Sequence, residues 1–316
     1  MPDPFVRKRA RRRPRLGLSA VLLSLMLVAC AGGGTNGPDG ATPDSGALRV
    51  VATTTVFADL VAQVGGEDVV VTSLVPMGGE VHTFDPSPSD VVRVAEAQLV
   101  VMNGLGLDDW LADVVADAGS TAPILKLGED LEGVEYLGDD HDAEAANPHL
   151  WLDVAHARRY AARIGAALAA ADPGGAAGYE SGAAAYDARL GELDAEIRSR
   201  LGEVPQSHRQ VVSFHEAFPY FAAAYGLEIV GVIIDAPGQD PSAGEIAELV
   251  GAIRSSGARA VFTEAQFSPD VAQTVAAEAG VAVVRDLHTD SLGDTPATTY
   301  LGMMRSNVDK VVEALR

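Results

Sequence analysis

The sequence predicts an α/β protein made of two doubly wound lobes with parallel sheets, joined by a long backbone helix. Strand-like and helix-like stretches alternate from residue 47 to residue 127, and the alternation returns from residue 210 to residue 315. Between the two series, residues 154–205 carry no strand signal, and their second half has a helical period. The roughly 270 residues after position 46 are enough to bury two cores.

Residues 47–175 form the predicted N-terminal lobe. Short runs rich in branched apolar residues predict strands at 47–53, 68–75, 98–102 and 123–127. Amphipathic stretches predict helices at 55–64, 89–97 and 107–118. Because helices alternate with strands, we expect the strands to run parallel, with helices on both faces of the sheet.

Residues 176–204 form the predicted linking helix, and residues 205–316 form the predicted C-terminal lobe. An Ala-rich helix is predicted at 153–171, where Asp153 is the expected N-cap. In the linker, apolar residues recur at spacings of three and four: Tyr186, Leu190, Leu193, Ile197 and Leu201. The C-terminal lobe repeats the first plan, with strands predicted at 210–214, 228–234, 259–263 and 281–285. Its helices are predicted at 217–225, 242–255, 269–279 and 298–315.

Residues 1–29 form a predicted export signal. Seven basic residues precede an apolar run from Leu16 to Ala29, which is shorter than the roughly 20 residues of a spanning helix. The run ends in Leu-Val-Ala-Cys, and Cys30 is the only cysteine in the chain. This ending resembles a bacterial lipobox, in which the cysteine becomes the first mature residue and carries a diacylglycerol. The alternative is an ordinary secretory signal with an incidental cysteine.

Lipidation of Cys30 would place the protein outside the cytoplasm, anchored to the cell membrane by its acyl chains. Residues 30–46 are rich in Gly, Pro, Asp and Thr and have no apolar period. We therefore predict that they form a flexible tether between the anchor and the folded lobes.

The charge of the chain excludes one class of partner. The net charge is −21, and residues 1–29 hold seven basic residues and one acidic residue, so the remainder carries −27. Nucleic-acid binding needs a basic surface, which this composition does not supply. Acidity attracts cations weakly at long range, although solubility or a high-salt habitat explains it equally well. With one cysteine, the mature chain has neither a disulfide framework nor a thiolate metal site.

Four residues with metal-ligating side chains follow predicted strands or precede predicted helices: His82, His149, His215 and Asp290. Ligands of open α/β sheets bind at the carboxyl ends of strands, and a cleft between two such lobes is lined by those ends. Three neutral imidazoles and one carboxylate suit a four-ligand site for a divalent metal. Each residue alone also has an ordinary structural explanation, such as a helix cap for Asp290. Their common location favours a metal site.

The segments around these residues resemble the metal-binding lipoproteins of ABC transporters, the zinc/manganese solute-binding proteins of cluster A-I. The resemblance covers almost the whole mature chain, through the lipobox and segments 81–90, 147–153, 214–221, 263–264 and 289–293. It implies two lobes linked by one rigid helix, with one metal ion between them. His82 and His149 would come from the N-terminal lobe, and His215 and Asp290 from the C-terminal lobe.

The resemblance also implies a carrier rather than an enzyme. The metal would be delivered to a membrane permease driven by a cytoplasmic ATPase, and we expect a monomer. Glu264, after a predicted strand, is either an acceptor that orients a ligand imidazole or a helix-capping or surface carboxylate. The segment before His82 departs from the family's usual small-polar run, which puts a ligand role for Glu80 in doubt.

The identity of the metal rests on the ligand types. Three imidazoles favour Zn²⁺, whereas Mn²⁺ prefers more oxygen ligands. Zinc-specific relatives often carry a long His-rich loop, but residues 138–144 hold only His141 and four acidic residues. His141 either recruits metal or belongs to a solvated acidic loop. Because the imidazoles must be neutral to bind, we expect affinity to fall below about pH 6.

Two other functions compete with the carrier. A zinc hydrolase could use the same histidine cluster, with Glu264 or Glu216 as general base. However, the chain lacks a His-Glu-x-x-His motif, and a fourth protein ligand would close the position that catalytic zinc keeps for water. A binding protein for a metal chelate would need an aromatic or Arg-lined pocket, and aromatic residues are only 5% of the chain.

Overall fold

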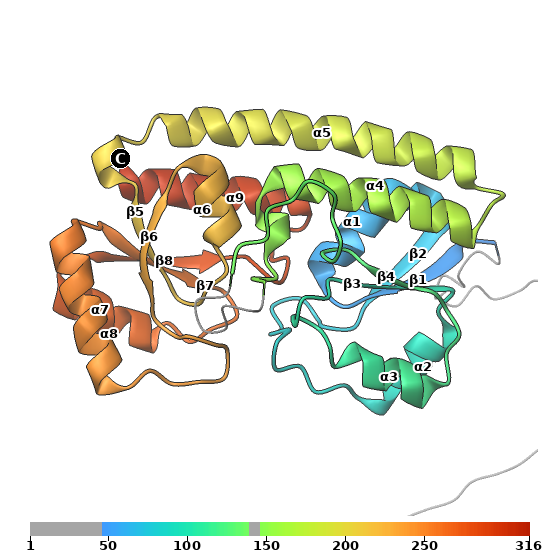
Figure 1. Cartoon of the computed structure of the whole chain (residues 1–316), viewed down its shortest axis with the longest axis horizontal. Helices are drawn as coiled ribbons and strands as arrows, with labels where there is room; N and C mark the ends of the chain where they lie inside the picture. The colour runs from blue at the N-terminus through green and yellow to red at the C-terminus, as the bar shows by residue number, and fades with distance from the viewer. Residues whose placement is uncertain (1–45, 139–145) are drawn as a thin grey trace, which may run out of the picture. The chain divides into compact units, whose positions relative to one another are not determined.

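The computed structural model describes residues 46–138 and 146–316. The predicted signal peptide, Cys30, most of the predicted tether and His141 lie outside the described residues. The described chain contains two four-stranded parallel sheets, each with helices on both faces (Figure 1). The predicted fold class is therefore confirmed.

The first sheet has the strand order β2-β1-β3-β4. Its strands are β1 (Leu48–Ala52), β2 (Val69–Ser73), β3 (Leu99–Met102) and β4 (Ile124–Lys126). Its helices are α1 (Thr55–Gly65), α2 (Pro88–Glu96) and α3 (Leu111–Ala118). Side chains alternate across the sheet, so Val50 packs in the cluster beside α1 while Val51 packs in the cluster beside α2 and α3. Both faces are buried, as a parallel sheet requires.

The second sheet repeats this order as β6-β5-β7-β8. Its strands are β5 (Gln210–Ser213), β6 (Glu228–Val232), β7 (Ala260–Glu264) and β8 (Ala282–Leu287). Its helices are α6 (Pro219–Tyr225), α7 (Ala243–Ser256), α8 (Asp270–Ala279) and α9 (Tyr300–Leu315). Val212 packs in the cluster beside α7 and α8, and Val211 packs in the cluster beside α6 and α9. In each sheet the second strand is added on one side of the first strand and the third strand on the other, and ligands of such folds bind where the strand order switches in this way.

Two long helices connect the lobes. Helix α4 (Val154–Ala171) is capped by Asp153, as predicted, because the Asp153 carboxylate accepts a hydrogen bond from the Ala155 N–H. Helix α5 (Ala176–Gly202) has 27 residues, about 40 Å of helix, and runs along both lobes (Figure 1). It packs against α1, α4 and α9. A Cβ on Gly182 would overlap the carbonyl oxygen of Val64, so this glycine permits the close contact with α1.

The helices α1, α4, α5 and α9 share one cluster of buried apolar side chains with both sheets. Because this core continues from one lobe into the other, the packing does not test the predicted lobe boundaries after residues 175 and 204. Those boundaries stay a prediction. In the part of the chain that the structure describes, no helix is long and apolar enough to cross a bilayer.

The predicted elements match the observed ones with small shifts at their ends. The largest shift is in α3, which begins at Leu111 rather than at residue 107. The preceding loop contains Gly104, Leu105 and Gly106 with positive φ, and it wraps around the buried carboxylate of Asp108. A long-range hydrogen bond from the Thr53 hydroxyl to Asp108 also holds this loop, and the local apolar pattern does not reveal it.

Candidate metal centre

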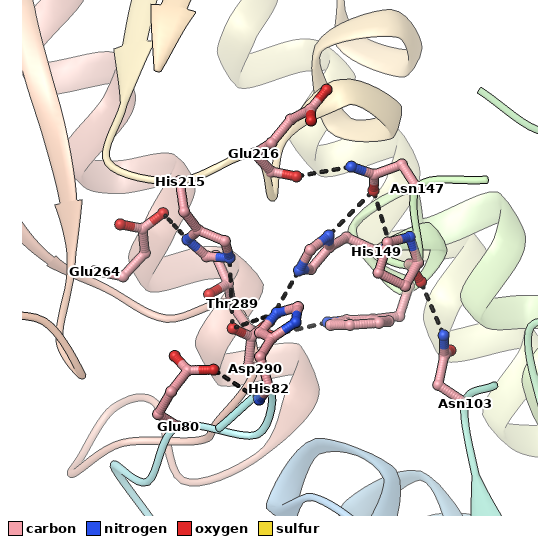
Figure 2. Close-up of polar contacts among 12 residues, drawn as sticks. Glu80, His82, Asn103, Asn147, His149, His215, Glu216, Glu264, Thr289 and Asp290 are labelled. Carbon is pink, nitrogen blue, oxygen red and sulfur yellow. Dashed lines mark hydrogen bonds and ion pairs between the residues drawn. The ribbon is translucent and has the colours of Figure 1, made fainter. Parts of the chain in front are cut away.

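The structure brings His82, His149, His215 and Asp290 together at the carboxyl ends of the strands of both sheets (Figure 2). One ligand-type atom from each residue lies within 4.8 Å of the others. His149, His215 and Asp290 are buried, whereas the His82 side chain is 19% exposed. The remaining described histidines are not part of this cluster.

The Asp290 carboxylate lies at the centre of the cluster. Its oxygens lie 3.5 Å from His149 Nε2, 3.6 Å from His215 Nε2 and 4.0 Å from His82 Nε2. These distances exceed those of good hydrogen bonds but suit atoms that share one cation. Among the described residues, His82 Nε2, His215 Nε2 and Asp290 Oδ1 have no hydrogen-bond partner although all three are buried. Buried polar atoms are rarely left in this way, so the set of atoms fits a metal ion.

His215 follows β5, and its ring orientation is set from the neighbouring strand. Its Nδ1 lies 3.0 Å from Oε1 of Glu264, the last residue of β7. When the Glu264 carboxylate is ionised it only accepts hydrogen bonds, so Nδ1 carries the proton and the opposite ring nitrogen, Nε2, faces Asp290. Glu264 is 1% exposed, so the alternative of a surface carboxylate is wrong.

His149 precedes a short 3-10 turn, Leu150–Leu152, which leads into α4. The Asn147 side-chain oxygen lies 3.0 Å from both the backbone nitrogen and the ring Nδ1 of His149. The ring also packs against Trp151, with ring centroids 5.2 Å apart. Trp151 Nε1 donates to the carbonyl of Thr289, the neighbour of Asp290. The His149 ring is therefore held on two sides.

His82 lies on the loop between β2 and α2. Its backbone N–H donates to the Glu80 carboxylate (2.8 Å). Gly78, in the same loop, has φ 74° and donates its N–H to the Ser291 hydroxyl (2.7 Å). This loop of the first lobe is thus hydrogen-bonded to the segment that carries Asp290. Glu80 therefore contacts the backbone of a candidate ligand.

Burial and charge shift the pKa values of these groups in different directions. Burial lowers the pKa of His82 to about 3. Burial also lowers the pKa of His215, but the charge and hydrogen bond of Glu264, with Asp290 and Glu80, outweigh it and raise the value to about 9. Burial raises the pKa of Glu80 to about 7, and Asp290 adds to this. The pKa values of His82 and His215 therefore move in opposite directions, because their neighbours differ.

Asp290 keeps its charge despite complete burial. Burial raises the pKa of its carboxyl, but the imidazoles of His149, His215 and His82 outweigh that effect and hold it well below the usual range. Gln266 supports it by donating its side-chain N–H to Asp290 Oδ2 (3.1 Å). Together these contacts keep one negative charge among three imidazoles, so a divalent cation bound there would have a charged partner.

A cavity of about 260 Å³ opens beside the cluster. It is lined by His82, His149 and His215, by Leu105 and Pro148, and by the acidic residues Glu216 and Asp235. The acidic lining would attract a cation to the three imidazoles.

The sequence profile of one protein family, described as "Zinc-uptake complex component A periplasmic" (ZnuA), matches residues 50–314. The chain belongs to the ZnuA family. This agrees with the resemblance found in the motifs and makes the protein a solute-binding component of a transporter. The family assignment favours solute binding over hydrolysis.

Relatives of the ZnuA-family chain bind several metals, according to their names. The manganese-binding lipoprotein MntA of Halalkalibacterium halodurans is 30% identical over 294 residues, covering 92% of this chain and 96% of the relative. The iron ABC transporter substrate-binding lipoprotein MtsA of Streptococcus pyogenes is 28% identical over 312 residues, covering 96% of this chain and 99% of the relative.

Solved structures show the same arrangement of the chain. The periplasmic zinc-binding protein TroA of Treponema pallidum matches with a TM-score of 0.80 and 26% identity, over 85% of this chain and 99% of TroA. A manganese-bound periplasmic metal-binding protein from Candidatus Liberibacter asiaticus matches with a TM-score of 0.77 and 25% identity, over 85% of this chain and all of that one. This chain therefore shares its fold with solved periplasmic metal-binding proteins.

Sequence reasoning missed two side chains that support the cluster, Gln266 and Asn147. Gln266 lies two residues after β7 and no local motif marks it. Asn147 precedes His149 by two residues, and an Asn at this spacing often bonds its side chain to the backbone two residues on. The Asn-Pro-His order was therefore a usable signal.

Proposed function

We propose that the protein is an extracytoplasmic lipoprotein that captures a divalent transition metal through His82, His149, His215 and Asp290 and delivers it to an ABC-transporter permease. The observation that carries this proposal is the buried cluster itself, in which three imidazole Nε2 atoms lie 3.5–4.0 Å from one carboxylate. Glu264 supports the site by fixing the tautomer of His215.

We propose zinc as the preferred cargo. Three nitrogen ligands and one carboxylate oxygen match the four-coordinate sites of zinc, and such ligands bind zinc more tightly than manganese. In a tetrahedral site with bonds of about 2.1 Å, ligand atoms lie about 3.4 Å apart, so a pair at the 4.8 Å limit of the cluster would close by about 1.4 Å on binding. The names of the relatives include manganese and iron as well as zinc, so the argument for zinc rests on the donor atoms.

The protonated imidazole of His215 suggests how capture and release are balanced. In the metal-free site at neutral pH, the His215 imidazolium neutralises part of the charge of Asp290 and Glu264. A metal ion replaces that proton and takes over the neutralisation. Capture therefore releases a proton, and acidification favours release of the metal.

Cys30 is the proposed lipidation site. Residues 1–29 would be removed, and residues 30–46 would tether the folded part to the membrane. The names of MntA and MtsA describe both as lipoproteins, which supports this assignment. The proposed partners are the permease and its ATPase, and the proposed state is a monomer. A Cys30→Ala variant should appear in the medium or soluble periplasm instead of the membrane fraction; retention of the variant in the membrane would contradict the anchor.

Metal content tests the central proposal. Residues 31–316, purified without a His-tag and incubated with zinc, should contain about one zinc ion per chain by elemental analysis. The His215→Ala variant should contain much less. Absence of bound zinc and manganese from the unmodified chain would overturn the carrier site. Competition between zinc and manganese at equal free concentrations tests the identity of the cargo. Preferential binding of manganese would contradict zinc as the cargo but would leave the carrier function standing.

A further inference from the structure

Asn147 lies in the segment that carries His149 and faces the segment that carries His215 (Figure 2). It is 1% exposed. Its side-chain oxygen accepts from the backbone N–H of His149 and lies 3.0 Å from the ring Nδ1, while its side-chain nitrogen donates to the carbonyl of Glu216 (2.8 Å). Glu216 directly follows His215. One side chain therefore contacts His149 of the first half and the neighbour of His215 in the second half.

The orientation of the Asn147 amide follows from its partners. The His149 backbone N–H can only donate, so the atom facing it must be the oxygen. The Glu216 carbonyl can only accept, so the atom facing it must be the nitrogen. Since the oxygen also faces His149 Nδ1, that ring nitrogen must carry the proton. The other nitrogen, Nε2, then has its lone pair directed at the metal site.

The backbone of Asn147 strengthens the same connection. Its carbonyl accepts a hydrogen bond from the Tyr220 hydroxyl (3.0 Å), and Tyr220 lies in α6, just after the His215 segment. The Asn147 N–H donates to the carbonyl of Leu137. The Tyr220 hydroxyl also accepts from the Leu137 N–H (3.1 Å). These backbone hydrogen bonds therefore hold Asn147 in place independently of the contacts that its side chain makes with the two histidine segments.

We propose that Asn147 is a positioning residue that couples the two histidine segments and thereby sets how long the metal stays bound. It fixes the proton on His149 Nδ1 and holds the backbone beside His215 at hydrogen-bonding distance. Glu264 orients His215 from within the second lobe, whereas Asn147 acts across the two lobes. The inference rests on the proposed metal-binding function.

Three variants of the mature chain, residues 30–316, separate these roles. Asn147→Ala removes the contacts to His149 and to Glu216. Asn147→Asp keeps an oxygen acceptor for His149 but removes the donor to Glu216. Tyr220→Phe, the matched control, removes a hydroxyl contact to the same segment without changing the Asn147 side chain. Zinc affinity is measured by competition, and the dissociation rate is measured after mixing with excess chelator.

Asn147→Ala should weaken zinc binding by about 10- to 100-fold, the usual effect of removing a group that orients a metal ligand. Tyr220→Phe removes two hydrogen bonds, but neither involves a histidine, so affinity should change by about fivefold or less. Asn147→Asp should release zinc faster than the unmodified chain, even though its added negative charge attracts the cation. If Asn147→Asp releases zinc no faster than the unmodified chain, the link to Glu216 is overturned. This outcome can be read even if Asn147→Ala does not fold.

NMR of the cobalt-substituted protein provides a readout that a loss of stability does not produce. The Nδ1–H protons of His149 and His215, which have protein partners, should give shifted signals that persist in water. The His149 signal should remain in Asn147→Asp and disappear in Asn147→Ala. Persistence of this signal in Asn147→Ala, unchanged zinc release from that variant, or an equal effect of Tyr220→Phe would overturn the inference. Failure of the unmodified chain to bind zinc or cobalt would instead overturn the proposed function.

Discussion

The two lobes have the same strand order, but they use the equivalent position of each sheet differently. In the first sheet, the ends of β1 and β3 are followed by Thr53 and Asn103, which both bond the buried carboxylate of Asp108. In the second sheet, β5 is followed closely by His215 and β7 ends at Glu264, which bond each other. Both positions thus pair a buried carboxylate with a donor, yet only the second pair faces the metal site.

The carboxylate of the first lobe shapes a loop. Asp108 accepts hydrogen bonds from the Thr53 hydroxyl and from the N–H groups of Asn103 and Gly104, at 2.7–2.9 Å. Asn103 in turn donates its side-chain N–H to the carbonyl of Pro148, next to His149. Topology therefore provides equivalent positions, and the side chains decide whether a position acts on the ion or on the backbone that presents a ligand.

A second difference concerns the segment that carries Asp290. It follows β8 of the second lobe, where Gln266 donates to Asp290, but several of its other hydrogen bonds cross to the first lobe. The Leu292 N–H donates to the Thr55 hydroxyl (2.8 Å), Gly78 donates to Ser291, and Trp151 donates to Thr289. The sequence-based count of two candidate ligands from each lobe holds along the chain. In space, the residues on either side of Asp290 are hydrogen-bonded to the lobe that supplies His82 and His149, whereas Asp290 itself accepts from Gln266 of the second lobe.

Replacing Asp290 should have the largest effect on metal binding. Asp290→Asn removes the charge that compensates the cation in a buried site, so zinc affinity should fall by more than roughly 100-fold, about 3 kcal/mol or more. Competition with a chromogenic chelator measures the affinity. Asp235→Asn, which lies at the same cavity but outside the cluster, should stay within a few-fold of the unmodified chain. Equal losses in both variants would mean that general acidity, rather than Asp290, holds the ion.

The pH dependence of zinc affinity tests the different surroundings of the histidines. Because Glu264 and Asp290 raise the pKa of His215 to about 9, zinc must displace its proton at neutral pH. Affinity should therefore fall about tenfold for each pH unit between pH 8 and pH 6, with about one proton released by His215. Glu264→Gln removes the main charge that raises this pKa, so proton release measured calorimetrically at pH 7.5 should decrease. Identical release from both chains would contradict this assignment.

Removing the Asp108 carboxylate should affect stability more than binding. Asp108→Ala leaves the Thr53 hydroxyl and two backbone N–H groups without their acceptor, which should lower the free energy of unfolding by about 2 kcal/mol or more. Chemical denaturation of the metal-free chain measures this loss. The neighbouring exposed residue provides the control, and Asp109→Ala should have little effect. The variant should still bind about one zinc ion per chain. If the folded variant no longer binds zinc, Asp108 acts on the metal site directly.

The smallest effect is expected where the Asp290 segment meets α1. Thr55→Val removes the hydroxyl that accepts from the Leu292 N–H and lies 3.2 Å from the Ser291 hydroxyl. Zinc dissociation should become about fivefold faster, the scale of one hydrogen bond. Thr274→Val is the control, because its hydroxyl bonds only within α8, away from the cluster. A dissociation rate unchanged by Thr55→Val would mean that this contact does not hold the Asp290 segment.

The sequence by itself determined the fold class and the positions of the elements, because their signals are local. The run of apolar residues in β1, the capping box of Ser242 and Glu245 and the left-handed Gly257 after α7 are all readable within a few residues. The four clustered residues were also found, because each adjoins an element end in a motif. Cys30, His141 and the lobe boundaries stay predictions.

Only the tertiary structure decided how these residues act on one another. Several contacts join segments that are far apart in the chain and that no common sequence pattern links. They are the contacts of Asn147 with Glu216, of Trp151 with Thr289 and of Gln266 with Asp290. The pKa values depend on the same contacts: His82 and His215 are the same residue type, but a buried carboxylate beside His215 moves its pKa in the opposite direction. Local patterns specify the backbone, whereas burial and charge arise only when distant segments meet.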